Sequence, residues 1–110
     1  MFYSIRFYDD AVEAQVLALP RTLLARYLAL ADRMVINGPN LGEPHTKAMG
    51  DGLFEMRLKG AEGIARVLYC TLVGRRIVVL HSFVKKTDKT PSQDLLLSRK
   101  RLKEIKDADT

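Results

Sequence analysis

Three strand-like segments follow one another between residues 53 and 84, and only short glycine-containing turns separate them. The segments are LFEMRLK, IARVLYCTL and IVVLHSFV, and the turns are GAEG and GR. Turns this short join antiparallel neighbours, because a parallel pair needs a crossover of a dozen or more residues. The sequence therefore predicts an antiparallel meander at the centre of the fold.

The first third of the chain predicts one more strand and a helical hairpin. YSIRFY alternates over residues 3–8, which is typical of a strand. Asp9 and Asp10 offer an N-cap for a short helix over residues 11–19, and Pro20 suits the first turn of a second helix over residues 21–36. The apolar stripe of that second helix comprises Leu23, Leu24, Tyr27, Leu28, Ala31, Met34 and Val35.

Residues 38–52 are rich in glycine and proline and are expected to form a loop. The stretch Thr90-Pro91-Ser92-Gln93 has the pattern of a capping box, and it predicts a C-terminal helix over about residues 91–106. The element order is then β-α-α-β-β-β-α. We expect a single α+β domain spanning residues 1–110, in which the helices, a two-helix hairpin and the C-terminal helix, pack against one face of a small, mostly antiparallel four-stranded sheet.

Charge and composition narrow the function classes. The net charge is +5, and residues 85–106, with eight lysines and arginines against three acids, account for all of it. This favours a polyanionic partner such as nucleic acid, although a solvated helix face would look the same. The single Cys70 predicts no disulfide and no zinc site. Without a signal peptide or a membrane-spanning run, a cytoplasmic protein is expected, with no metal and no cofactor.

The turns also fix a sheet register. A two-residue turn at Gly74-Arg75 and a four-residue turn over 60–63 would place Arg66 between Arg57 and Phe83. Since opposed residues share a face, one face would collect Glu55, Arg57, Lys59, Arg66, His81, Phe83 and Lys85. The other would form the core under the helices, with Phe54, Met56, Leu58, Val67, Tyr69, Val78, Leu80 and Val84.

Two directly opposed arginines destabilise a sheet, so a sequence that keeps them favours a functional explanation. A bound phosphate would remove the conflict, because guanidinium groups bind phosphate in bidentate fashion. The polar face would then be an open surface for an anionic substrate. The structural alternatives are a solvated or structural His81, and a Glu55 that only neutralises Arg57 or Arg66. His45, in the Gly/Pro loop, is interpreted as a surface residue.

The stretches LFEMRLKG, ARVLYC and RRIVVLHSFVKKTDKTP resemble the RelE/ParE superfamily of toxins, specifically its phage-derived HigB-like branch. The resemblance covers about residues 3–102, and the fold of that superfamily agrees with the predicted element order. It implies a bacterial type II toxin that cleaves mRNA, often on the ribosome. A small antitoxin would neutralise it. That antitoxin is often a helix-turn-helix protein, through which the toxin would reach operator DNA indirectly.

The resemblance also implies roles for particular residues. By position, Arg57 and Arg66 would bind phosphate, Lys85 and Lys86 would be the basic pair after the last strand, and His81 matches the histidine of the motif. Some members of the superfamily instead poison DNA gyrase. A gyrase inhibitor and a non-catalytic nucleic-acid-binding module therefore stay open as alternatives.

A metal-independent ribonuclease needs a base for the 2'-hydroxyl proton and cations around the reacting phosphate. Either His81 or Glu55 could be the base, and Phe83 could stack on a nucleobase. The candidate catalytic residues are His81, Glu55 and Arg66, and the candidate RNA-binding residues are Arg57, Lys85, Lys86 and Phe83.

Overall fold

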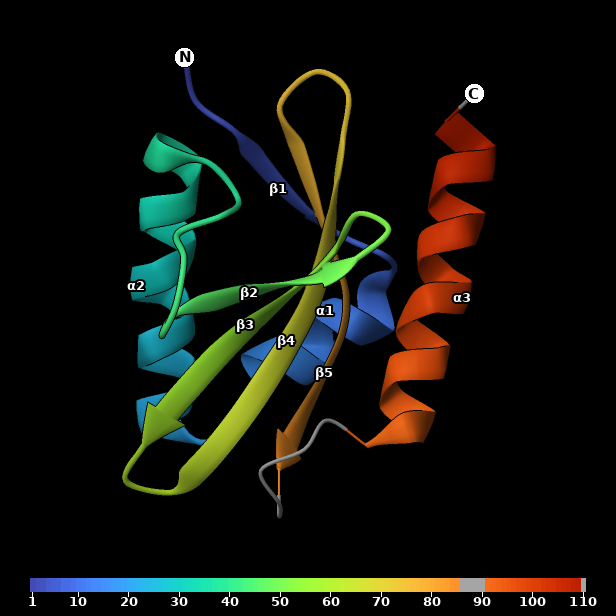
Figure 1. Ribbon diagram of the computed structural model, residues 1–110. Helices are drawn as coiled ribbons and strands as arrows, with labels where there is room; N and C mark the ends of the chain where they lie inside the picture. The colour runs from blue at the N-terminus through green and yellow to red at the C-terminus, as the bar shows by residue number, and fades with distance from the viewer. Residues whose placement is uncertain (86–90, 110) are drawn as a thin grey trace.

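The structure of the protein, a computed structural model, describes residues 1–85 and 91–109. Its elements are β1 (Ser4–Phe7), α1 (Asp10–Leu17), α2 (Arg21–Asn37), β2 (Thr46–Gly50), β3 (Leu53–Gly60), β4 (Gly63–Leu72), β5 (Arg76–Lys85) and α3 (Ser92–Asp109). The strands form one sheet in the order β1-β5-β4-β3-β2, in which β1 is parallel to β5 and the other neighbours are antiparallel (Figure 1). The α+β class and the central meander are confirmed.

The sheet has five strands, so the prediction of a loop over residues 38–52 was wrong for β2. This strand pairs with β3 from Thr46 opposite Met56 to Gly50 opposite Leu53, with an irregularity after Ala48. Its sequence, TKAMG, has no apolar alternation, and only Thr46 is buried. A short edge strand of this kind depends on its partner for stability, and its own side chains carry little signal.

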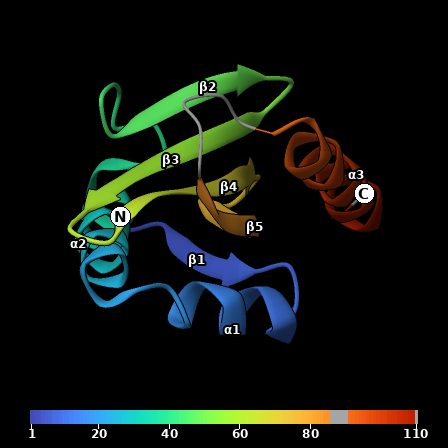
Figure 2. The same cartoon turned by 90° about the horizontal axis from the view of Figure 1, so that it is seen from below.

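The helices lie on both faces of the sheet, whereas the sequence predicted one helical face (Figures 1 and 2). Helices α1 and α2 cover one face, where Met56, Leu58, Val67 and Tyr69 belong to the core as predicted. Helix α3 covers part of the opposite face. It packs over a second core that contains Leu53, Leu68, Cys70, Val78, Leu80 and Leu102.

A β-bulge in β5 explains why Val78 and Leu80 lie under α3 and not under the helical hairpin. Tyr69 pairs with Val79 and Leu68 with His81, so Leu80 is an extra residue. The turn before β5 is also one residue longer than predicted, because Leu72 pairs with Arg76. The longer turn and the bulge shift the register of β5 by one residue in opposite directions, so their effects cancel beyond the bulge. The predicted pairing is therefore correct from Leu68 to Ile64 and wrong nearer the turn. Val84, also predicted in the core, is 47% exposed.

Helix α2 is held against the β3–β4 hairpin at its first turn. Its N-cap, Pro20, makes no side-chain cap bond, and the Thr22 amide donates to Glu62 Oε1 at 3.1 Å. Hydrogen bonds from Thr22 hold the pKa of the Glu62 carboxyl below its usual range. A side chain at Gly60 would meet Thr22 Oγ1 at 2.2 Å, so the hairpin and α2 are in close contact. Leu28, predicted to be on the buried stripe of α2, is 49% exposed.

The cations of α3 bind backbone carbonyl groups of the sheet and of the turn between β2 and β3. Arg99 Nη2 donates to Met49 O at 2.9 Å, and Arg101 Nη1 donates to the carbonyl of the bulge residue Leu80 at 2.8 Å. Lys106 Nζ donates to Asp51 O at 3.3 Å. Part of the basic run therefore anchors α3.

No helix within the described residues is long and apolar enough to cross a membrane.

Because α3 packs over the core that contains Cys70, the rate at which the Cys70 thiol is alkylated should report on the contact between α3 and the sheet. Burial raises the pKa of the Cys70 thiol to about 11, and only the thiolate reacts rapidly with alkylating agents. We expect iodoacetamide to label the native protein at pH 8 far more slowly than the unfolded protein, as measured by mass spectrometry. Leu102→Ala, which removes the buried contact of α3, should accelerate native labelling. Leu96→Ala, at a position 69% exposed on the same helix, should not. Equal rates in native and unfolded protein would contradict this packing.

Candidate active site

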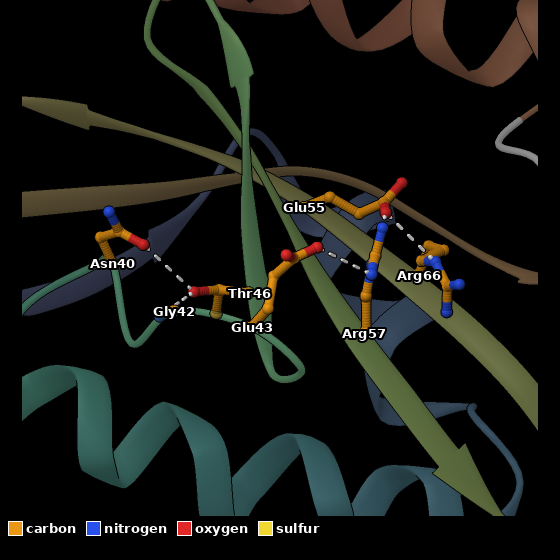
Figure 3. A network of polar contacts seen from close by, with 7 residues as sticks. All are labelled: Asn40, Gly42, Glu43, Thr46, Glu55, Arg57 and Arg66. Atoms are coloured by element: carbon orange, nitrogen blue, oxygen red, sulfur yellow. Dashed lines mark hydrogen bonds and ion pairs between the residues drawn. The ribbon is translucent and has the colours of Figure 1, made fainter.

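The centre of the site is a pair of arginines on neighbouring strands. Arg57 of β3 lies directly opposite Arg66 of β4, and Phe83 of β5 completes the row, as the register predicted. Glu55 Oε1 lies 3.3 Å from Arg57 Nε and 3.2 Å from Arg66 Nε (Figure 3). One carboxylate oxygen therefore contacts both guanidinium groups in this structure.

A second carboxylate reaches Arg57 from the loop before β2. Glu43 Oε1 lies 3.3 Å from Arg57 Nη1 (Figure 3). The loop is fixed by buried Thr46, whose Oγ1 accepts the Gly42 amide at 2.9 Å, and by the Arg57 amide, which donates to His45 O at 2.8 Å. Sequence reasoning missed Glu43, because nothing in the pattern of residues 38–52 indicated that the loop lies beside β3.

His81 lies in the next row, opposite Leu68, and α3 adds a partner for it that the sequence did not reveal. Its Nε2 lies 2.5 Å from Asp94 Oδ1. Its Nδ1 is buried and has no hydrogen-bond partner within the described residues. The ring stacks against Phe83, with centroids 5.6 Å apart. Asp94 was missed because α3 was expected on the other face of the sheet.

The site is largely enclosed, which corrects the expectation of an open sheet surface. The side chains of Glu55, His81 and Arg66 are only 2%, 9% and 10% exposed, because α3 and the neighbouring strands pack around them. The side chain of Arg57, at 31% exposed, is more accessible than these three. An anionic ligand that arrives from solvent therefore meets Arg57 first.

The three remaining predicted residues, Lys85, Lys86 and Phe83, have different outcomes. Lys85 is opposite Ile64 in the next row, but it is 8% exposed and engaged with other groups, so it is not a projecting cation. Lys86 lies outside the described residues. Phe83 is half-buried beside Arg66 and His81. The structure therefore brings together Glu55, Arg57, Arg66, His81 and Phe83.

A pocket of about 370 Å³ opens beside the arginine pair. Its lining comes from α2, the loop before β2, and the β3–β4 hairpin, and consists of Arg26, Pro44, His45, Arg57, Leu58, Lys59, Ile64 and Arg66. His45 is half-buried here, although the sequence suggested a surface residue. Within residues 1–85 and 91–109, no three histidine, cysteine or acidic side chains are grouped as metal ligands would be.

A family model described as phage derived protein Gp49-like matches residues 14–103. The chain belongs to this family. A mutant of the E. coli toxin RelE in the free state has the same fold, with a TM-score of 0.68 at 14% sequence identity, over 93% of this chain and 99% of that one. A search of curated proteins finds no match. The family and the fold confirm the resemblance to the RelE/ParE superfamily, and the HigB-like branch stays a prediction.

The shared carboxylate predicts a specific response to anions. Glu55→Gln leaves two opposed arginines without their common counter-charge, and breaking a buried ion pair typically destabilises a protein by about 3 kcal/mol or more. We expect this loss in urea denaturation at low salt. Sulfate should restore the variant more than it stabilises the wild type, because the anion can occupy the position between the guanidinium groups.

The wild type is the control for the general stabilising effect of sulfate. Equal stabilisation of both proteins would mean that the arginine pair does not bind an anion of this kind.

Proposed function

We propose that this Gp49-like protein is the toxin of a type II toxin–antitoxin system and that it cleaves mRNA without a metal ion. The observation that carries the proposal is the arginine pair, Arg57 and Arg66, with a buried carboxylate and an imidazole in the adjoining row. The likeness in fold to RelE, which is itself described as a toxin, supports it. The protein would act in the bacterial cytoplasm.

The arginines would bind the scissile phosphate and stabilise the negative charge that develops on it. Their opposed placement lets both guanidinium groups contact one phosphate, and fixed donors of this kind contribute strongly to catalysis. The phosphate would take over the role of Glu55 as their counterion. A metal would instead require a cluster of carboxylates and histidines, and this site supplies cations.

The nucleophile would be the 2'-hydroxyl oxygen of the RNA itself. A base removes its proton, the oxygen attacks phosphorus, and the bond from phosphorus to the 5'-oxygen breaks. The departing 5'-oxygen takes up a proton, which leaves a 2',3'-cyclic phosphate and a 5'-hydroxyl end. Substitution of the 2'-hydroxyl by hydrogen at the cleaved nucleotide should therefore abolish cleavage.

His81 is the stronger candidate for the base. Asp94 Oδ1 is the partner of Nε2, and Nδ1 has no partner within the described residues. In the neutral ring with its proton on Nε2, the lone pair of Nδ1 is therefore available to accept a proton. Glu55 is the second candidate, and its Oε1 is occupied by two arginines until phosphate replaces it. Because Nδ1 is shielded, catalysis through His81 requires the contact between α3 and β5 to open.

The partners would be mRNA, with or without the ribosome, and a small antitoxin encoded nearby. The superfamily resemblance favours a helix-turn-helix antitoxin, which would carry the complex to its operator DNA.

The decisive experiment is induction of the protein alone in bacteria, with mapping of transcript ends. We expect growth arrest, new 5'-hydroxyl ends within mRNAs, and rescue by co-expression of the neighbouring small gene. Arg66→Ala should reduce cleavage about 10²–10³-fold, since one well-placed charge stabiliser typically contributes that much. Lys100→Ala, on the exposed side of α3, is the matched control and should retain cleavage.

Unimpaired growth at high expression of folded protein would contradict the toxin proposal. Growth arrest with intact transcripts, insensitivity to His81→Ala and accumulation of cleaved DNA would favour gyrase inhibition. Equal effects of Arg66→Ala and Lys100→Ala would mean that the positive charge attracts RNA without forming a catalytic site.

A further inference from the structure

The pocket beside the arginine pair is an accessible part of the site. Exposed side chains such as Arg26 and Lys59 line it, in contrast to the buried Glu55 and His81. Arg66, whose side chain is 10% exposed, lines the pocket together with Arg57. β2 pairs with β3 only as far as Met56, so the end of β3 beyond Arg57 is not covered by β2. The pocket therefore gives a ligand in solvent a route to the opposed arginines.

Among the described residues, four arginines and lysines and no carboxylates line the pocket, so it has an excess of positive charge. Glu43 and Glu55 contact Arg57, and Glu55 also contacts Arg66. Arg26 of α2 and Lys59 of β3 line the same space, and the interactions recorded within the described residues include no ion pair for either. Both are exposed side chains. Two cations are thus available for an anion beyond the one that the arginine pair would hold.

The remaining walls suit a nucleoside better than a bare anion. Pro44 and Ile64 provide apolar surface, and His45 provides a half-buried aromatic ring. The backbone of His45 is fixed on both sides, since its amide donates to Gly42 O at 3.1 Å and its carbonyl accepts the Arg57 amide at 2.8 Å. A volume of about 370 Å³ falls within the range of small-molecule sites. Cations next to a stacking surface are typical of single-stranded nucleic-acid binding.

The position of the pocket relates its ligand to the scissile phosphate. Lys59 is two residues further along β3 than Arg57, a rise of roughly 6.7 Å along the strand. The close contact between Gly60 and Thr22 keeps α2, and with it Arg26, beside this part of the hairpin. The spacing between the two sets of cations is therefore set by rigid elements.

We propose that this pocket is a nucleotide subsite: it binds the nucleotide adjacent to the scissile phosphate, with Arg26 and Lys59 on that nucleotide's phosphate and His45 against its base. This rests on the proposed function for the identity of the substrate as single-stranded RNA. It adds a binding role for Arg26, Lys59 and His45, none of which takes part in the chemistry proposed above.

The test measures binding of a fluorescein-labelled RNA oligonucleotide that carries a 2'-deoxy substitution at the cleaved nucleotide, so that it cannot be cut. Anisotropy titrations in KCl between about 50 and 200 mM give the dependence of affinity on salt. Each phosphate contact to a single strand contributes about 0.7 to the slope of log affinity against log salt. We expect Arg26→Ala to reduce the slope by about 0.7. Arg33→Ala, an exposed arginine on the same helix, should leave it unchanged.

Two further measurements locate the nucleotide. His45→Ala should weaken binding about tenfold with little change in slope, because stacking does not depend on counterion release. The shortest tightly bound RNA is then shortened by one nucleotide, at each end in turn. One of these two truncations should weaken RNA binding by the wild type but not by Arg26→Ala. That end of the RNA is then the one in the pocket.

Equal slopes for Arg26→Ala and Arg33→Ala, with truncation effects that simply add, would overturn the subsite. Normal RNA binding by Arg26→Ala with weakened antitoxin binding would also overturn it, because the pocket would then belong to a protein interface.

The probe cannot be cleaved, so this test does not depend on catalysis. Binding at the subsite without cleavage of natural RNA would refute the ribonuclease proposal alone, and cleavage unaffected by Arg26→Ala would refute the subsite alone.

Discussion

The arrangement of the site depends on one carboxylate oxygen between two opposed arginines. Like charges roughly 6 Å apart repel each other by about 3 kcal/mol at an effective dielectric constant of about 20. Glu55 Oε1 contacts Nε of both Arg57 and Arg66, so the meander can form with the pair in its middle. A pair of opposed cations that requires a counterion in the free protein can exchange that counterion for a substrate phosphate.

The bulge at Leu80 provides the apolar surface on which α3 packs beside the site. Without the extra residue, Leu80 would lie with the core under α1 and α2. With it, Val78 and Leu80 contribute to the core under α3. Arg101 binds the carbonyl of Leu80, and the same helix brings Asp94 to His81. A local irregularity in one strand thus couples the packing of α3 to the orientation of the candidate base.

The sequence predicted the meander and the opposed pair of Arg57 and Arg66, because a short turn restricts the register of neighbouring strands. Phe83 lies in the predicted row only because the longer turn before β5 and the bulge cancel. It could not predict β2, whose five residues carry no apolar alternation. It also placed α3 on the wrong face. The side on which that helix packs is decided by a bulge and by long-range bonds from Arg99 and Arg101 to backbone carbonyls. Asp94, Glu43 and Arg26 reach the site or its adjoining pocket from distant segments, and no short-range pattern links them to Arg57.

The central claim is that Arg57 and Arg66 bind one phosphate together. The most direct measurement is a double-mutant cycle on the affinity for an uncleavable RNA, with Arg57→Ala, Arg66→Ala and both changes combined. If both side chains hold the same phosphate, removal of the first weakens the contact of the second. The cycle should then show a coupling of about 1 kcal/mol or more. Losses that add within about 0.3–0.5 kcal/mol would mean that the two arginines act at separate places, and would contradict the account.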